Sequence, residues 1–292
     1  MLIFAMFRRY PLMGGPKQTW RHRSAEALSN VFDVFARIPG RRFYTLHLEA
    51  AARQYRREVN VIEIAVKNEY IKFRTPTGKA LWRAETLLSK EPATIGWIDT
   101  FDQADVFWDV GANIGIYSLY ASRIRGVETL AFEPASFNYA LLCDNVHLNK
   151  LDGRIAPYNL AFSAQTQLGQ LKLDDDEPGS AFATVEEKSE GRFEQSVLVF
   201  SVDDFIARFS PPFPTHIKID VDGLEEQILE GARRTIADLR LKSLLVEVDE
   251  VEPKRPQRVD AVLGTYGFTL IEAQRSPLAP DYPARNRIYR RL

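Results

Sequence analysis

Cysteine, net charge and long apolar runs are all scarce in this sequence of 292 residues. Cys143 is the only cysteine, so the chain can form no internal disulfide and no zinc site built from several thiolates. The formal net charge is −1, which provides no overall field to attract nucleic acid. No apolar run approaches the ~18 residues of a membrane-spanning helix. We therefore expect a cytoplasmic protein with no nucleic-acid partner and no stable membrane insertion.

The first 60 residues differ from the rest of the chain in their charge. They carry eleven Lys and Arg residues against four Asp and Glu. Ser24 is a suitable N-cap for one helix, and a second helix is expected over 43–57, after Pro39-Gly40. The basic side chains form either a solvated helix face, which we favour, or a patch that meets an anionic substrate or carrier.

Short elements follow before the pattern changes near Asp102. Residues 61–66 and 70–73 alternate as in a β-hairpin, and 80–88 has a helical pattern. Another helix is expected to start at Glu91-Pro92, because proline is tolerated in a first helical turn. We therefore expect an α+β N-terminal extension over 1–100, made of helices and a β-hairpin, and a second domain over 101–292.

From residue 106 onward strands alternate with helices, the pattern of a parallel sheet with right-handed crossovers. Core strands are expected over 106–110, 127–132, 155–162, 216–221 and 244–248, and helices over 114–124, over 137–148, from 224 and up to 266. Additional strands over 168–173 and 197–200 are expected in the long connection, and 268–271 with 287–290 as a final antiparallel pair. The prediction is an α/β, Rossmann-like, doubly wound and mostly parallel sheet.

The strand over 106–110 leads into a glycine turn. Its apolar residues favour burial on both faces, and Gly111-Ala112-Asn113-Ile114-Gly115 follows. A strand, a glycine turn and a helix together direct backbone N–H groups toward one point, where a cofactor can bind. The turn lacks the G-x-G-x-x-G spacing of a dinucleotide site and the Gly-Lys-Ser/Thr ending of a P-loop. Asp109 would repel a pyrophosphate but suits the ammonium and sulfonium charges of S-adenosylmethionine.

Glu133 ends the next strand, 24 residues after Asp109. In a doubly wound sheet these two strands are neighbours, and ligands bind beyond their carboxyl ends. A carboxylate at this position can accept hydrogen bonds from both hydroxyls of a ribose. A structural turn with no ligand is the alternative interpretation.

A second charged motif runs over 217–225. Period-two alternation places Lys218, Asp220 and Asp222 on one side of an extended segment, with Gly223 at the following turn. Three ionisable groups on one side of a central strand are costly to bury unless they are paired or functional. An ion pair with a helix N-cap from Asp222 is the structural alternative.

Taken together, these motifs resemble the FkbM-type S-adenosylmethionine-dependent methyltransferase family. The resemblance rests on Asp-Val-Gly-Ala-Asn-Ile-Gly (109–115), Phe-Glu-Pro (132–134) and Ile-Lys-Ile-Asp-Val-Asp-Gly-Leu-Glu (217–225), and it covers about residues 90–250. The family more usually has Glu where this chain has Asp222, a change that keeps the charge and shortens the reach. The resemblance implies a class I methyltransferase fold with a seven-stranded sheet, S-adenosylmethionine as cofactor, and O-methylation of a sugar, glycan or natural product.

The resemblance also implies roles for individual residues. Asp109, Gly111, Asn113 and Gly115 would line the methionine end of the cofactor, and Glu133 would hold the ribose. Pro134 and Ser136 would shape the adenine side, which Ala161 and Phe162 would flank, although Phe162 is equally suited to the core. Asp220 would lie by the methionine moiety or the transfer site.

Transfer to a hydroxyl requires alignment of acceptor, methyl group and sulfur, and it benefits from a base. The candidate catalytic residues are Asp222 and Glu247, ranked first, and Asp220. His216 begins a strand, at the wrong end of the sheet for catalysis, and we expect it to be structural. The same three carboxylates could instead bind Mg²⁺, although our prediction has no metal.

Two further functions stay open. The chain could be an N-methyltransferase of a small amine or peptide, or a non-catalytic cofactor-binding or assembly module. Ser210-Pro211-Pro212-Phe213 resembles the acceptor motif of N-methyltransferases, but it precedes a strand where that motif should end one. The expected partner is a small-molecule or glycan acceptor, and a homo-oligomer is compatible with the sequence.

Overall fold

A computed structural model of the chain describes residues 60–173, 177–180, 183–184 and 193–291. The chain divides into two compact units, Met1–Val61 and Ile62–Leu292, and the second is described below. The two helices predicted before residue 58 lie outside the described residues. None of the helices in the described part is long and apolar enough to cross a membrane.

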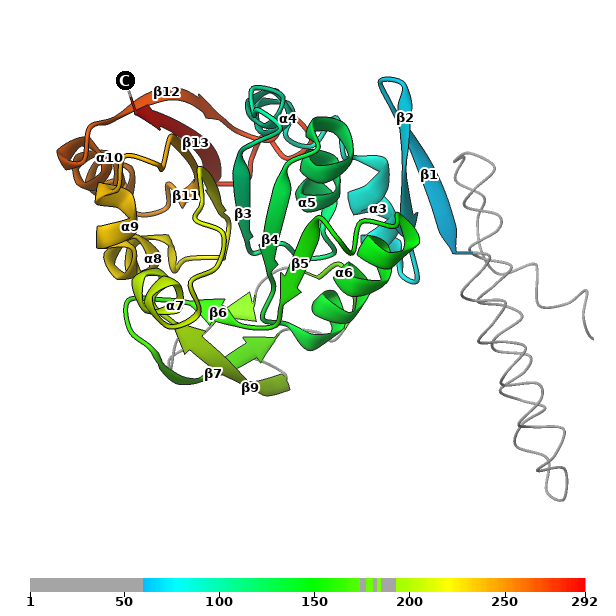
Figure 1. The fold of residues 1–292 in the computed structure, drawn as a ribbon, viewed down its shortest axis with the longest axis horizontal. Helices are drawn as coiled ribbons and strands as arrows, with labels where there is room; N and C mark the ends of the chain where they lie inside the picture. Colours follow the sequence, from blue (N-terminus) through cyan, green and yellow to red (C-terminus); the bar gives the residue numbers. More distant parts are fainter. Residues whose placement is uncertain (1–59, 174–176, 181–182, 185–192, 292) are drawn as a thin grey trace, which may run out of the picture. The chain divides into compact units, whose positions relative to one another are not determined.

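A seven-stranded sheet forms the centre of this unit (Figure 1). Its strands are β3 (Val106–Val110), β4 (Glu128–Phe132), β5 (Ile155–Tyr158), β10 (His216–Ile219), β11 (Ser243–Asp249), β12 (Phe268–Gln274) and β13 (Ala284–Arg291). The spatial order is β12-β13-β11-β10-β3-β4-β5. Only β13 runs antiparallel to its neighbours, β11 and β12. This mostly parallel α/β sheet has the class I methyltransferase topology, so the predicted fold class is confirmed.

Helices cover both faces of the sheet because its central strands, such as β3, are apolar on both sides. Phe107 packs with the side chains of α4 (Pro92–Ile98) and α5 (Ile116–Tyr120). Its neighbour Trp108 points to the opposite face and packs with the group that contains α8 (Glu225–Gly231), α9 (Arg233–Ala237) and α10 (Arg255–Thr265). Two apolar layers therefore hold the sheet, as the buried strand predicted.

The elements that precede the sheet pack in the same unit. The predicted hairpin is present as β1 (Val61–Val66) and β2 (Glu69–Arg74), followed by α3 (Gly78–Glu85) and α4. Ile71, Leu81 and Trp97 belong to the same buried cluster as Phe107 of the sheet. Residues 62–100, assigned to the extension from the sequence, thus share one core with the strands that follow.

A second, four-stranded sheet lies in the long connection. It consists of β6 (Ala161–Phe162), β9 (Phe193–Phe200), β7 (Gln167–Leu173) and β8 (Ala183–Thr184), in that order. The single strand predicted over 155–162 is wrong, because β5 and β6 belong to different sheets. Asn159 lies between them, and its side-chain amide donates to the carbonyl oxygens of Glu133 and Pro134 at 2.8 and 2.9 Å.

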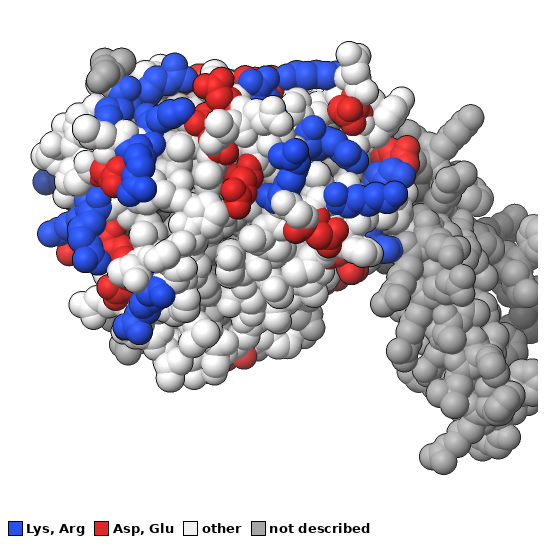
Figure 2. Space-filling model, in the orientation of Figure 1, with Lys and Arg blue, Asp and Glu red and all other residues white. Residues whose placement is uncertain are grey.

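Other boundaries also differ from the prediction. The helix expected over 114–124 consists of α5 and a π-helical turn over Ala121–Arg125, and α6 (Ser136–Leu148) agrees with its prediction. The helix α7 (Val202–Phe209) was not predicted, although the side chain of Ser201 caps it by accepting a hydrogen bond from the Asp204 N–H. Figure 2 shows basic and acidic side chains interspersed over the upper part of one face, whereas the lower part, over β7 and β9, shows little charge.

Candidate cofactor and acceptor site

The two predicted motifs meet at the carboxyl ends of β3 and β10. These strands are neighbours at the point where the strand order reverses, the usual position of a ligand crevice in such sheets. A Cβ atom on Gly111 would lie 1.9 Å from the carbonyl oxygen of Asp220, and Gly111 has φ +83°. Both the contact and the left-handed backbone therefore require glycine at this position.

The N–H groups of the glycine turn already have partners within the protein. Those of Gly111 and Ala112 donate to the Phe132 carbonyl oxygen, each at 3.0 Å. The Asn113 N–H donates to Glu133 Oε2 at 2.8 Å. A pyrophosphate needs such groups as donors. The turn therefore suits a cofactor that is recognised by carboxylates.

Glu133 is the first of these carboxylates. It is 5% exposed, and its Oε1 accepts a hydrogen bond from the Ala135 N–H at 2.9 Å. Burial raises the pKa of Glu133 to about 7, against the opposing effect of its backbone donors. Each carboxylate oxygen can accept a second hydrogen bond. Glu133 thus keeps the capacity to bind two hydroxyl groups.

An apolar cavity of about 320 Å³ lies beside the glycine turn. The structure places four of the predicted cofactor residues in its lining: Gly111, Pro134, Ala161 and Phe162. Val110, Phe132, Leu160, Leu171, Val221 and Leu224 complete the lining, and none of these was predicted. Flat apolar walls of this kind suit an aromatic base.

Three other predicted residues, Asn113, Gly115 and Ser136, lie outside that lining. Asn113 donates its side-chain amide to the Ser180 carbonyl oxygen at 2.7 Å, and Gly115 begins α5 with φ 86°. Ser136 is exposed, and its N–H donates to the side chain of Gln195 at 2.9 Å. Phe162 serves the core as well, since its ring centroid lies 4.8 Å from that of Phe132.

Lys218 is the centre of a buried charged cluster below the turn. Its Nζ lies 2.7 Å from Asp220 Oδ2 and 3.9 Å from Asp109 Oδ1. Burial works against the charge of Lys218, but the charges of Asp220, Asp109 and Glu91 together outweigh it and raise the pKa of the amine. Burial likewise opposes ionisation of Asp220, but the charge of Lys218 lowers the pKa of that carboxyl. Asp220 is therefore a carboxylate at neutral pH.

Asp109 is the exception in this cluster. It is 1% exposed, and Ser118 Oγ donates to its Oδ2 at 2.6 Å. Its Oδ1 is buried and has no hydrogen-bond partner. Burial raises the pKa of Asp109 despite the nearby charge of Lys218. Apart from the ion pair with Lys218 at 3.9 Å, this carboxylate oxygen has no donor, and such an oxygen beside the glycine turn fits a cationic ligand group, as the sulfonium cofactor requires.

Glu247 and Asp222 line a second cavity, of about 490 Å³, next to this cluster. The other lining residues are Gly223, Glu225, Asp249, Tyr282, Pro283 and Ala284. Glu247 forms a hydrogen bond with Asp220, and burial, helped by the charge of Asp220, raises the pKa of Glu247 well above its ordinary value. The structure thus brings together all three carboxylates that the sequence proposed for catalysis.

Asp222 reaches this position by a route that the sequence did not predict. The strand β10 ends at Ile219, two residues earlier than expected, so the alternation of side chains stops there. Asp222 then takes a left-handed backbone conformation with φ 52°. This turn places its side chain in the cavity lining beside Glu247.

Sequence reasoning missed a contribution from the segment before the sheet. Glu91 is 3% exposed, and its Oε1 lies 2.6 Å from the Nζ of Lys90. It also accepts a hydrogen bond from the Tyr117 hydroxyl, and it acts electrostatically on Asp220 and Lys218. Burial opposes ionisation of Glu91, but the charge of Lys90 lowers its pKa. The sequence marks Glu91 only as a helix start, so no signal there pointed to the cluster.

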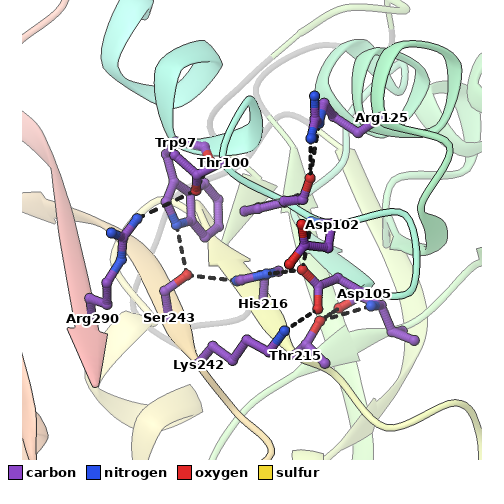
Figure 3. A network of polar contacts seen from close by, with 12 residues as sticks. Trp97, Thr100, Asp102, Asp105, Arg125, Thr215, His216, Lys242, Ser243 and Arg290 are labelled. Carbon is purple, nitrogen blue, oxygen red and sulfur yellow. Dashed lines mark hydrogen bonds and ion pairs between the residues drawn. The ribbon is translucent and has the colours of Figure 1, made fainter. Parts of the chain in front are cut away.

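A metal site finds no support in the structure. Among the described residues, no three His, Cys, Asp or Glu side chains are grouped so that they could hold a metal ion. His216 lies at the amino end of β10, as predicted, and its hydrogen bonds go to Asp105 and Ser243 (Figure 3).

Two curated proteins named as methyltransferases resemble this chain in sequence. "Hexuronic acid methyltransferase AglP" of Haloferax volcanii is 25% identical, over 63% of this chain and 72% of that protein. "Methyltransferase sdnD" of Sordaria araneosa is 27% identical, over 59% of this chain and 76% of that protein.

Solved structures resemble the chain more remotely. TYW2 of P. horikoshii in complex with MeSAdo shows 14% identity with a TM-score of 0.44, covering 79% of this chain and 71% of that one. The precorrin-6y C5,15-methyltransferase of Geobacter metallireducens shows 13% identity with a TM-score of 0.41, covering 68% and 86%. The model of the "Methyltransferase FkbM domain" matches residues 109–270. The match spans more than half of the chain, which therefore belongs to the FkbM methyltransferase family and uses S-adenosylmethionine as its cofactor.

Proposed function

We propose that this chain transfers a methyl group from S-adenosylmethionine to a hydroxyl oxygen of a sugar, glycan or natural-product acceptor. One observation carries the proposal: Asp220, Asp222 and Glu247 converge at the carboxyl ends of β10 and β11, beside the glycine turn. The cofactor supplies an activated methyl group when it is bound. The task of the protein is then to orient the acceptor and to take its proton.

The chain's residues suit three parts of the cofactor. Glu133 would accept hydrogen bonds from the ribose hydroxyls, and Pro134, Ala161 and Phe162 would enclose the adenine in the apolar cavity. The unpartnered Oδ1 of Asp109 would face a positive group at the methionine end. Asn113 and Gly115 would hold the turn in shape, and Ser136 would act at the rim of the adenine side.

Glu247 and Asp222 are the proposed proton acceptors. A general base must be able to hold the proton that it takes, and burial and the charge of Asp220 raise the pKa of Glu247. A positive charge in the crevice would favour the ionised form of Glu247, which is the form that can accept a proton. In the transfer the methyl–sulfur bond breaks, a methyl–oxygen bond forms, and the hydroxyl proton passes to the carboxylate. Asp220, held as an anion by the hydrogen bond from Lys218, would position Glu247 through the hydrogen bond between Asp220 and Glu247.

The relative named as a hexuronic acid methyltransferase supports a sugar acceptor, at an identity that leaves the acceptor of this chain a proposal. An N-methyltransferase of small amines or peptides is the alternative enzyme. A cofactor-binding module without turnover is the alternative that is not an enzyme. Product analysis distinguishes the first, and turnover the second.

The test combines calorimetry with transfer of labelled methyl groups to a panel of sugars and polyols. We expect S-adenosylmethionine to bind in the micromolar range and an O-methyl product to form. Glu247→Gln and Asp222→Ala should keep cofactor binding while at least one of them lowers turnover about 10²–10⁴-fold, the usual contribution of a general base. A folded protein that does not bind the cofactor would sink the proposal, and an N-methyl product would replace it with the amine alternative.

A further inference from the structure

We call the second cavity, which Asp222 and Glu247 line, the acceptor cavity. Among the described residues, its lining contains acidic side chains and no basic one. Four of its eight lining residues are carboxylic acids: Asp222, Glu225, Glu247 and Asp249. Tyr282, Pro283, Ala284 and Gly223 supply the rest, so none of the described Lys and Arg residues lines the cavity. Its charge is therefore set by how many of the four carboxyl groups are ionised.

Glu225 is the lining residue through which the acidic cavity would bind a ligand. It is 3% exposed, and its Oε1 accepts a hydrogen bond from the Gly223 N–H at 3.0 Å. Its Oε2 is buried without any hydrogen-bond partner. Burial raises the pKa of Glu225 to about 7. A buried acceptor atom that lines a cavity and lacks a donor is the usual mark of a ligand contact.

The carboxyl groups of the cavity also act electrostatically on Tyr282, which lines the same cavity. Burial raises the pKa of the Tyr282 phenol, and the charges of Glu247, Asp222, Asp220 and Asp249 raise it further. Its side chain is 37% exposed, so an aromatic ring stands at the rim in a negative field. Aromatic faces attract cations and stack on sugar rings.

Four basic side chains among the described residues form ion pairs with carboxylates outside the cavity lining. Lys90 Nζ lies 2.6 Å from Glu91 Oε1, and Arg255 Nε lies 3.7 Å from Glu226 Oε2. On the strand side, Arg285 and Arg275 both pair with Glu250, at 2.9 and 2.8 Å. None of these four cations lines the cavity, and Lys90 and Arg255 act on Glu247 and Glu225 only from outside it, so the described part of the chain places no basic side chain where an anionic acceptor would lie.

We infer that the acceptor is a polyhydroxylated molecule that carries a protonated amine, such as an amino sugar, with the ammonium group bound by Glu225 Oε2 in the acidic cavity and the methylated hydroxyl near Glu247. The inference rests on the proposed function and names its acceptor class. It also sets this chain apart from the relative named for a hexuronic acid, whose substrate is an acid.

The test uses the full chain saturated with S-adenosylhomocysteine and three sugars that differ in charge: glucosamine, glucose and glucuronic acid. Ligand-observed NMR at pH 7 measures their affinities. We expect glucosamine to bind at least about tenfold more tightly than glucose, or about 1.4 kcal/mol, and glucuronic acid to bind least. Glucuronic acid binding as tightly as glucosamine, or an absence of glucosamine binding, would overturn the inference.

Two variants and one ion assign the effect to the cavity. Glu225→Gln keeps the acceptor for the Gly223 N–H and should remove most of the preference for glucosamine over glucose. Glu230→Gln on the same helix is the matched control, because Glu230 is exposed and pairs with Arg233; its preference should equal that of the wild type. If Mg²⁺ or Mn²⁺ alone raises the melting temperature of the wild type but not of Glu225→Gln, the cavity binds a metal and the amine assignment is wrong. Cofactor titration is a separate readout, so failure of the proposed function is distinguishable from failure here.

Discussion

The strand β10 carries two buried polar clusters, one at each end, and they differ in how their hydrogen bonds are satisfied. His216 begins the strand and Lys218 follows two residues later on the same face. The His216 cluster at the amino end is closed (Figure 3). The Lys218 cluster at the carboxyl end leaves Asp109 Oδ1 without a hydrogen-bond partner, and Glu225 Oε2 also lacks one.

In the His216 cluster the hydrogen bonds form a chain from Trp97 through Ser243 and His216 to Asp105. Trp97 Nε1 donates to Ser243 Oγ at 2.8 Å, and the Ser243 hydroxyl then donates to His216 Nδ1 at 2.7 Å. His216 Nε2 donates in turn to Asp105 Oδ2 at 3.0 Å, and Lys242 binds the other oxygen of Asp105. Serine, histidine and aspartate lie together as in a hydrolase, but all three are buried. The network instead joins α4, through Trp97, to the sheet.

The two clusters show how buried charged groups that stabilise the fold differ from those that can bind a ligand. Where every donor and acceptor is paired inside the protein, the cluster contributes to the fold. Where acceptors are left over and carboxyl pKa values are raised beside a cavity, the protein has reserved capacity for a ligand. Residue type alone does not distinguish the two cases, since both clusters contain a base, a carboxylate and a serine.

The largest expected effect comes from removing the central cation of the open cluster. Lys218→Met leaves the buried Asp109 and Glu91 and the half-buried Asp220 without their shared cation, with Lys90 as the remaining one beside Glu91 and Asp220, so the free energy of unfolding should fall by about 3–5 kcal/mol. Lys242→Met, at the other end, removes a cation whose side chain is 53% exposed and should cost no more than about 1 kcal/mol. Urea titration of both variants measures the difference. Equal losses would show that the two clusters are energetically alike.

Gly111→Ala should have the next largest effect, because the added Cβ would collide with the Asp220 carbonyl oxygen in a left-handed backbone. We expect a loss of about 2–4 kcal/mol of stability together with loss of cofactor binding. Gly264→Ala in α10 is the control, since nothing lies within 4 Å of its Cβ position. Circular dichroism and calorimetry test both variants. Full cofactor affinity in Gly111→Ala would contradict the close contact between the two turns.

His216 should make stability depend on pH. Burial lowers its pKa from 6.5 to about 4, so between these values the unfolded chain binds a proton that the folded chain does not. The free energy of unfolding should therefore fall as the pH drops from 6.5 to 4, by up to about 3 kcal/mol from this residue. Carboxyl groups with raised pKa values, such as Glu133, act in the opposite direction over this range.

The difference between the wild type and His216→Gln isolates the histidine from those carboxyl groups. His147→Gln, at a side chain that is 83% exposed, is the matched control. Denaturation at several pH values should show a shallower acid slope in His216→Gln alone. Identical slopes in the wild type and His216→Gln would show that His216 is not held neutral by burial.

The sequence predicted those parts of the molecule that depend on local pattern. The apolar strand 106–110, the glycine turn and Glu133 follow from periodicity and turn chemistry, and they lie where predicted. The place of β6 in another sheet did not follow, because it depends on pairing with β9 far along the chain. Glu91 and Glu225 were missed as site residues for the same reason: their burial and their neighbours arise only from tertiary packing.

Asp222 shows what could be predicted from the local sequence pattern and what depends on the tertiary structure. Strand alternation was expected to place its side chain on the side of Lys218 and Asp220, but the structure brings Asp222 to the cavity of Glu247 through a left-handed turn after β10. The pairing of β10 with β11 brings Glu247 to the same cavity. The neighbouring strands of Asp109 and Glu133 followed from the predicted fold class, whereas the backbone conformation at this turn did not.

The most direct test of the account is calorimetric titration of S-adenosylmethionine into the wild type, Glu133→Ala and His216→Gln. We expect the wild type and His216→Gln to bind S-adenosylmethionine in the micromolar range at pH 7. Glu133→Ala should bind it at least about tenfold more weakly, which corresponds to about 1.4 kcal/mol of binding free energy. Absence of binding by the folded wild type, or an equal loss in His216→Gln and Glu133→Ala, would contradict the assignment of the carboxyl end as the functional one.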